Sequence, residues 1–288
     1  MKGMTAVANE LTMQNVTFLL EDGKAEEPPF INSIEFNLKQ RHQAKELWLP
    51  NLAHNDFKTI FVASDFGGDH QESEFRTYSF VFAGYEFLGP VLNQFKRIRY
   101  RHGLIEPYRE INFKEFRYGP IGRCVPDWLQ ASNCITGLLF TLVVSKDCKT
   151  LFGVDDAKVP KQLAKMMEDL GFGSWSPDDT EKVLRIVHVI GYFLGLLSRP
   201  GQNVIWMCDN DSIAANADRV EQLRKLFALR LSQYGHGQYG EVALAFPFEK
   251  TEESFHLSEF LSVVDLSAGS IAELLTRRIG NFETENSL

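Results

Sequence analysis

The chain has 288 residues, of which 44% are hydrophobic and 24% charged, a composition that suits a folded domain with a sizeable core rather than a disordered chain. Its formal net charge of −8 does not by itself indicate nucleic-acid binding. The longest apolar stretches are about ten residues long, half of what a membrane helix needs. The start of the chain lacks the pattern of a signal peptide, and the four cysteines form no C-x-x-C pair. We therefore expect a cytoplasmic protein with reduced cysteines and no membrane partner.

The first 57 residues have the weakest pattern of the chain. Residues 16–20 have the composition of a short strand, and residues 26–29 have that of a turn or linker. We expect 1–57 to form an N-terminal extension that packs on the core or binds a partner. Residues 58–280 are then the main domain, and 281–288 a polar, frayed tail.

From residue 58 onward, strand and helix patterns follow one another. Apolar or β-branched runs bounded by turn residues predict strands at 59–64, 77–85, 111–113, 138–145, 203–208 and 242–246. The first two strands are expected to be antiparallel, and 138–145 to be a central strand. Helical spacing predicts helices at 86–100, 160–170, 176–197, 213–233 and 257–277, with Ser176 as N-cap of the third. This mixed order predicts one α/β domain with helices on both faces of its sheet and a helical pair inserted near 155–200.

Three acidic residues occupy comparable places in this pattern. Asp65 follows the predicted strand 59–64, and Asp209 follows the predicted strand 203–208. If these strands are parallel and adjacent, both carboxylates lie at the edge of the sheet where α/β proteins bind ligands. Asp265 lies in the last predicted helix, and small residues one turn away allow that helix to approach the sheet closely: Ser262, Ala268 and Gly269.

Carboxylates that converge in this way repel one another unless a cation neutralises them. Oxygen ligands of this kind suit Mg²⁺ or Mn²⁺, and a pair of such ions ~3.5–4 Å apart activates water for phosphodiester hydrolysis. For any one of the acids, a role as turn former or helix N-cap is the simpler explanation, and Asp209 or Asp211 is placed to cap the next helix. Asp265, inside a helix and flanked by small residues, is harder to explain in that way.

A basic segment stands out in this acidic chain. Residues 96–123 contain eight Lys or Arg against three Glu, together with several aromatic residues. Such a segment is suited to holding a phosphate backbone and stacking bases, so nucleic acid is the expected partner. The alternative is a solvated loop whose aromatic residues belong to the core.

The order of these motifs resembles that of a large bacterial family of ribonuclease H-like proteins. The residues that carry the resemblance are SDFGGDH at 64–70, INFKEFRYG at 111–119, VIWMCDND at 204–211 and FLSVVDLSAGSIAELL at 260–275. The resemblance implies a ribonuclease H-like mixed sheet flanked by helices, and an E-x-K motif in which Lys114 is the lysine. Asn112 stands at the glutamate position of that motif, so Glu110 or Glu115 is the candidate to take its place.

The leading hypothesis is a metal-dependent nuclease that hydrolyses phosphodiester bonds of DNA or RNA. Asp65, Asp209 and Asp265 are its expected ligands for Mg²⁺ or Mn²⁺, Glu110 or Glu115 the fourth acid, and Lys114 a charge facing phosphate. The alternative is a catalytically weak module that binds nucleic acid or protein in a defence or mobile-element system, which Asn112 favours. A small-molecule enzyme ranks last because no cofactor motif is present. The sequence leaves the oligomeric state open.

Overall fold

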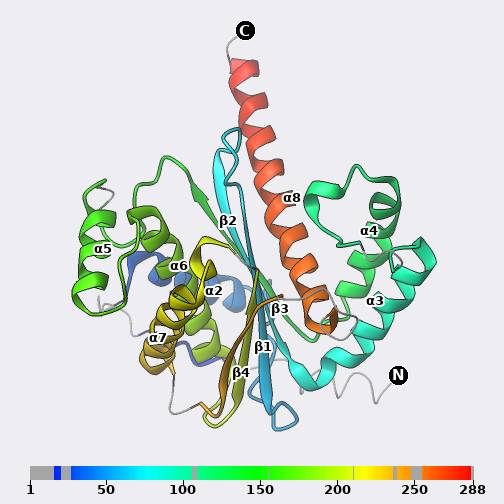
Figure 1. Ribbon diagram of the computed structural model, residues 1–288, viewed down its shortest axis with the longest axis horizontal. Helices are drawn as coiled ribbons and strands as arrows, with labels where there is room; N and C mark the ends of the chain where they lie inside the picture. The colour runs from blue at the N-terminus through cyan, green and yellow to red at the C-terminus, as the bar shows by residue number, and fades with distance from the viewer. Residues whose placement is uncertain are drawn as a thin grey trace. The chain divides into compact units, whose positions relative to one another are not determined.

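The computed structural model describes residues 16–20, 27–105, 109–154, 156–209, 211–235, 239–247 and 255–286. It contains a mixed five-stranded sheet with strand order β3-β2-β1-β4-β5, accompanied by helices (Figure 1). The α/β fold class expected from the sequence is confirmed. No helix in these ranges is long and apolar enough to cross a membrane.

The elements follow one another along the chain in an order close to the predicted one. The strands are β1 (Thr59–Gly67), β2 (Phe75–Gly84), β3 (Gly137–Ser145), β4 (Asn203–Cys208) and β5 (Val242–Ala245). The helices are α2 (Pro29–Gln43), α3 (Leu88–His102), α4 (Gly119–Ser132), α5 (Val159–Asp169), α6 (Pro177–Leu197), α7 (Ala217–Tyr234) and α8 (Phe255–Asn286). Short 3₁₀ turns are η1 (Tyr85–Phe87), η2 (Phe113–Glu115) and η3 (Ser212–Ala214).

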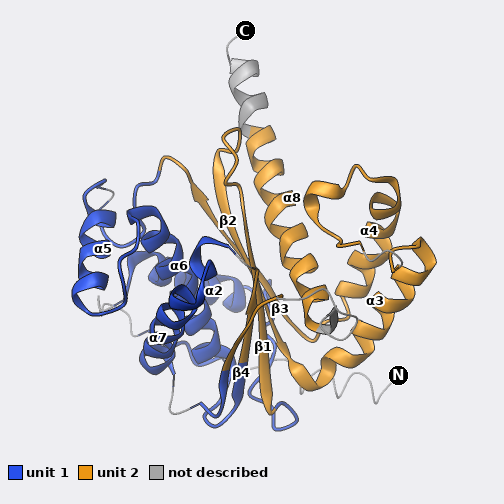
Figure 2. Ribbon diagram, viewed as in Figure 1, with its two compact units in different colours: residues 1–57, 148–204, 210–242 blue, residues 58–147, 205–209, 243–288 orange. Residues whose placement is uncertain are grey.

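The chain divides into two compact units that alternate along the sequence (Figure 2). Unit 1 comprises 1–57, 148–204 and 210–242, and unit 2 comprises 58–147, 205–209 and 243–288. Residues 1–57 therefore group with α5, α6 and α7, and the predicted helical pair near 155–200 belongs to the same unit.

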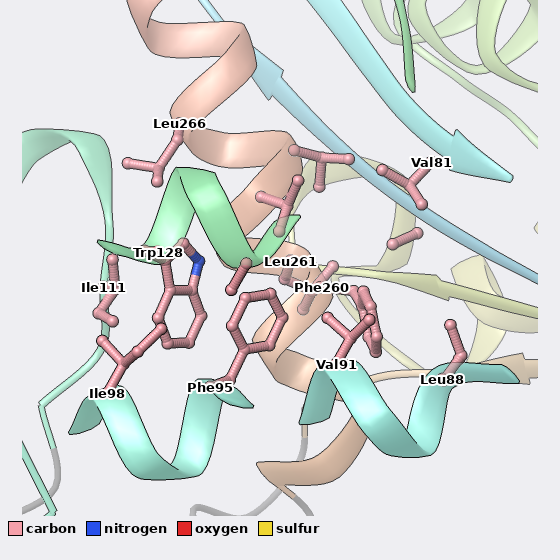
Figure 3. Packing of buried hydrophobic residues seen from close by; sticks show 14 of the residues in the cluster. Val81, Leu88, Val91, Phe95, Ile98, Ile111, Trp128, Phe260, Leu261 and Leu266 are labelled. Carbon is pink, nitrogen blue, oxygen red and sulfur yellow. The ribbon is translucent and has the colours of Figure 1, made fainter. Parts of the chain in front are cut away.

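Unit 2 is built on the antiparallel strands β1, β2 and β3. Helix α8 packs against β1 and β2, and α3 packs against α4. The core between them is rich in aromatic side chains (Figure 3). Phe95 of α3 stacks on Trp128 of α4, with ring centroids 3.9 Å apart, and Phe61 of β1 meets Phe260 of α8 at 5.3 Å. Burial of such large rings is the main force that holds α3, α4 and α8 together.

Unit 1 is organised around α6, which is buried along almost its whole length. The predicted N-cap is confirmed, because Ser176 accepts a hydrogen bond from the backbone N–H of Asp179. Gly191 allows α7 to pack closely, since a Cβ at this position would lie 2.9 Å from the ring of Tyr234. His188 of α6 accepts or donates a hydrogen bond of 2.7 Å with the Tyr234 hydroxyl.

Two of the predicted strands are not observed, and a third lies at a different place in the sheet. Residues 16–20 form no strand, because the amides of Leu19 and Leu20 donate to the Glu35 carboxylate instead of to a strand partner. Residues 111–113 do not form a strand either, since Asn112 caps the turn η2. The apolar run 138–145 was expected at the centre of the sheet, but β3 lies at its edge and pairs with β2 alone.

Two helices escaped the sequence analysis, and one extends further than expected. Both α2 and α4 carry proline in the first turn, where a missing N–H is tolerated. At the start of α2 the prolines had the pattern of a turn or linker. Helix α8 continues to Asn286, into the segment for which the sequence predicts a tail.

Candidate carboxylate site in unit 2

Asp65 lies inside β1 rather than after it. The ladder with β2 continues to Gly67, and Asp65 is paired with Ser79. Successive side chains of a strand point to opposite faces, so Asp65 shares the face of Phe61 and Ala63. Those two residues belong to the core that contains α8. The strand therefore directs the Asp65 carboxylate toward α8.

Helix α8 approaches the two strands unusually closely at this point. A Cβ on Gly67 would lie 3.1 Å from the carbonyl carbon of Ala268 and 2.7 Å from Oγ1 of Thr77. The Thr77 hydroxyl donates a 2.9 Å hydrogen bond to the Ala268 carbonyl. The last helix does approach the sheet closely, as predicted, and at Ala268 the approach depends on Gly67 of β1.

Asp265 of α8 is held by Phe113, the first residue of η2. The backbone N–H of Phe113 donates a 2.5 Å hydrogen bond to Oδ2 of Asp265. The ring of Phe113 fills the space beside Gly269, where a Cβ would lie 2.3 Å from the ring carbon Cγ. Phe113 thus contacts the Asp265 carboxylate through its backbone and the next turn of α8 through its side chain.

The Asp65 and Asp265 carboxyl groups are in direct contact through a side-chain hydrogen bond. Burial raises the pKa of Asp65 to about 8, and the charge of Asp265 adds to the shift. Burial also raises the pKa of Asp265, while the hydrogen bonds from Phe113 and Asp65 oppose the rise. The pair consequently shares a proton near neutral pH, with Asp65 as the hydrogen-bond donor.

Asp209 is the third acid of this region. It follows β4, it is exposed, and its charge raises the pKa of both Asp65 and Asp265. The neighbouring Asp211 has a different task, because its side chain caps η3 by accepting from the N–H of Ile213 and pairs with Lys182 at 2.7 Å. The capping role considered for Asp209 or Asp211 therefore falls to Asp211.

The donor chemistry of this site fits a hard divalent cation. Two half-buried carboxylates in contact, with a third acid nearby, provide only oxygen ligands and an excess of negative charge. In the part of the chain that the structure describes, no three His, Cys, Asp or Glu side chains form a group arranged to hold a metal ion. Magnesium commonly binds through only one or two carboxylates and completes its shell with water or phosphate. The Asp65–Asp265 pair matches that limited requirement.

The remaining predicted site residues surround η2. Lys114 is exposed, and its charge lowers the pKa of Asp265. Asn112 accepts a 3.0 Å hydrogen bond from the N–H of Glu115, so the residue at the expected glutamate position is a structural cap. Glu110 and Glu115 are both exposed, and the role of either as a fourth acid stays a prediction.

The basic segment 96–123 separates into buried and exposed parts, with 106–108 outside the described residues. Arg99 is buried and forms a bidentate ion pair with Glu259, so it is not a surface cation. Arg101 pairs with Asp127 at 2.9 Å. Arg109 lies over the ring of Tyr118, with the guanidinium carbon 4.6 Å from the ring centroid. The other basic residues are exposed: Lys96, Arg97, Lys114, Arg117 and Arg123.

The fold and this site define an α/β protein with a carboxylate pair beside a cationic surface segment. No family model matches the chain, and no curated protein matches it. Among solved structures, a chain from the complex of PCNA with RNase HII of Archaeoglobus fulgidus is similar over 78% of this chain and 77% of its own length. Its sequence identity is 13% and its TM-score 0.36, a level at which the likeness does not establish a shared fold.

Two features of the site were missed by the sequence analysis. The first is the hydrogen bond from the Phe113 amide to Asp265, which no side-chain pattern signals. The second is the ion pair between Arg99 and Glu259, which lie 160 positions apart in the sequence. Gly269, a glycine inside an otherwise strong helix, was the available signal that another group occupies the adjoining space.

Proposed function

We propose that the protein is a metal-dependent nuclease that hydrolyses phosphodiester bonds of DNA or RNA. The observation that carries this proposal is the contact between the Asp65 and Asp265 carboxyl groups, with Asp209 nearby and exposed cations on the adjoining segment. Such an arrangement concentrates negative charge where a cation binds and positive charge where a phosphate backbone binds.

In this mechanism Asp65 and Asp265 would hold Mg²⁺ or Mn²⁺, and Asp209 would add negative charge from the exposed side. Binding of the cation would require Asp65 to release its proton to solvent, since a carboxylate binds a cation in its ionised form. The chemistry that such a cation would supply is positive charge for a phosphodiester oxygen and a lowered pKa for a water molecule. Lys114 faces the phosphate, and the nearby cations Arg117 and Arg123 hold the nucleic-acid backbone.

The test is cleavage of labelled single- and double-stranded DNA and RNA in Mg²⁺ and in Mn²⁺. We expect Asp65→Asn and Asp265→Asn each to lower the cleavage rate by at least about 100-fold, because each removes a charged metal ligand. The exposed Asp169 of α5 provides the matched control, and Asp169→Asn should cleave at the wild-type rate. Cleavage that survives in either site variant would remove the proposed mechanism.

A catalytically weak binding module is the second candidate. It is favoured by Asn112, which caps η2 at the position where the resemblance implies a glutamate. Calorimetric titration with Mg²⁺ and Mn²⁺ separates the two candidates. Heat of binding that disappears in Asp265→Asn supports the nuclease, whereas no binding of either ion at millimolar concentration supports the module.

A further inference from the structure

Arg99 belongs to the basic segment 96–123, yet it contributes nothing to the surface. Its side chain is only 3% exposed, and its guanidinium group makes contacts in several directions. Nε and Nη2 donate to the two carboxylate oxygens of Glu259 on α8, at 2.5 and 2.6 Å. Nη1 donates to the backbone carbonyl of Arg109 at 2.5 Å. The group also lies against the Trp128 ring of α4, 5.2 Å from the centroid.

These contacts join two segments that meet again at the carboxylate site. Glu259 precedes Asp265 by six residues on α8, which is about 9 Å along a helix. Arg109 precedes Phe113 by four residues, and four extended residues reach at most about 14 Å. Both segments are therefore anchored at two points, through Arg99 at one end and through the Phe113–Asp265 hydrogen bond at the other.

The residues between the anchors leave little freedom for this segment. Ile111 is fully buried in the unit 2 core. The Phe113 ring fills the space next to Gly269 on the helical turn that follows Asp265. An arginine is needed at the distant anchor, because its planar fork satisfies a carboxylate with one edge and a carbonyl with another nitrogen.

We propose that Arg99 is a positioning residue of the carboxylate site, which sets the segment 109–113 against α8 so that the Phe113 amide holds Asp265 in its ligand orientation. The inference rests on the proposed metal site for its functional meaning. It predicts that a substitution at Arg99, remote from the carboxylates, changes both the hydrogen-exchange rate of the Phe113 amide and the affinity of the site for a cation.

The experiment uses Arg99→Lys in the full-length chain. A lysine keeps the positive charge opposite Glu259 but is a point charge, which does not also reach the Arg109 carbonyl with planar geometry. We measure hydrogen exchange of the Phe113 amide in EDTA and, separately, Mn²⁺ affinity by calorimetry. We expect exchange at least tenfold faster and Mn²⁺ binding at least tenfold weaker than in the wild type.

The chain offers a matched control in the other unit. Arg185 of α6 is equally buried and pairs with Glu181 at 2.7 Å. Arg185→Lys perturbs a buried ion pair of the same kind, so it should lower stability in urea while changing neither readout by more than twofold. Equal effects of the two substitutions would show that only general destabilisation is involved, and the inference would be overturned.

A second variant covers the case in which Arg99→Lys does not fold. The double substitution Arg99→Gln with Glu259→Gln removes both charges and leaves no unpaired ion in the core. It should show the same faster exchange at Phe113, and wild-type exchange in a folded variant overturns the inference. If the wild-type protein binds no Mn²⁺, the proposed function fails, while the Phe113 exchange still decides whether Arg99 positions the segment.

Discussion

The raised pKa of Asp65 predicts how the stability of the metal-free protein depends on pH. An aspartate in the unfolded chain titrates near 3.9, whereas burial and the Asp265 charge raise the pKa in the folded protein to about 8. Ionisation of Asp65 therefore opposes folding. Below pH ~4 Asp65 is protonated in both states and does not lower the free energy of unfolding. As the pH rises from about 4 to 8, the free energy of unfolding falls progressively. At about 1.4 kcal/mol per pH unit, the loss at pH 7 is on the order of 4 kcal/mol.

Asp65→Asn removes this ionisation and keeps an N–H donor for Asp265. We expect urea unfolding in EDTA to give similar free energies for the variant and the wild type near pH 4.5. At pH 8 the variant should be more stable by several kcal/mol. Millimolar Mg²⁺ should then raise the stability of the wild type at pH 8 and leave that of the variant almost unchanged, because the cation takes the place of the shared proton.

Asp169→Asn serves as the control for a charge removed from the exposed surface, and its pH profile should run parallel to that of the wild type. The decisive comparison is between Asp65→Asn and the wild type. If their profiles are also parallel from pH 4.5 to 9, Asp65 is ionised throughout, and the account of a proton shared between buried carboxyl groups is refuted.

Three further outcomes are expected from other parts of the structure. Gly269→Ala should lower the free energy of unfolding by about 1–2 kcal/mol despite the better helix propensity of alanine, because its Cβ meets the Phe113 ring; urea titration tests this. Burial lowers the pKa of His188 to about 3, so the wild type loses stability as the pH falls below 6.5, where the imidazole of the unfolded chain binds a proton. His188→Gln should reduce this loss in the free energy of unfolding by on the order of 2 kcal/mol at pH 5. Unfolding curves of the wild type and the variant at pH 5 and 8 measure the difference. Arg117→Ala combined with Arg123→Ala should weaken nucleic-acid binding and reduce the slope of log affinity against log salt by about 2, measured by fluorescence anisotropy; an unchanged slope would place the binding surface elsewhere.

Elements with strong internal periodicity could be predicted from the sequence. β4 was predicted with its observed bounds, and the cap of α6 was identified from Ser176 because local capping chemistry decides it. The edge position of β3 could not be predicted in the same way. Its apolar run fits a central strand, and the choice between edge and centre depends on which strands pair, which is a property of the whole sheet.

The same distinction between local and long-range interactions applies to the candidate site. The three acids were identified because each follows or interrupts a regular apolar pattern. Their interaction with the backbone could not be identified, because the Phe113 amide and Asp265 are separated by 152 positions and any residue except proline supplies an N–H. The burial of Arg99 could not be predicted for a related reason. A basic residue in a basic segment suggests a surface, and only the folded α8 brings the Glu259 carboxylate to it.

The charges of the basic segment and of the carboxylate pair depend on each other. Among the described residues, Lys114 is a cation whose charge lowers the pKa of Asp265. Because Lys114 is exposed, solvent weakens its effect on this half-buried carboxyl group. The positive charge near Asp65 is therefore too small to offset the burial of an ionised carboxylate. Near neutral pH a bound proton neutralises the group instead. Under the proposed function a divalent cation would do so more completely, and it would add positive charge near the exposed Asp209. Under the same proposal, we expect a bound cation to strengthen the binding of a phosphate backbone by the cations of 109–123, even though the chain carries a net charge of −8.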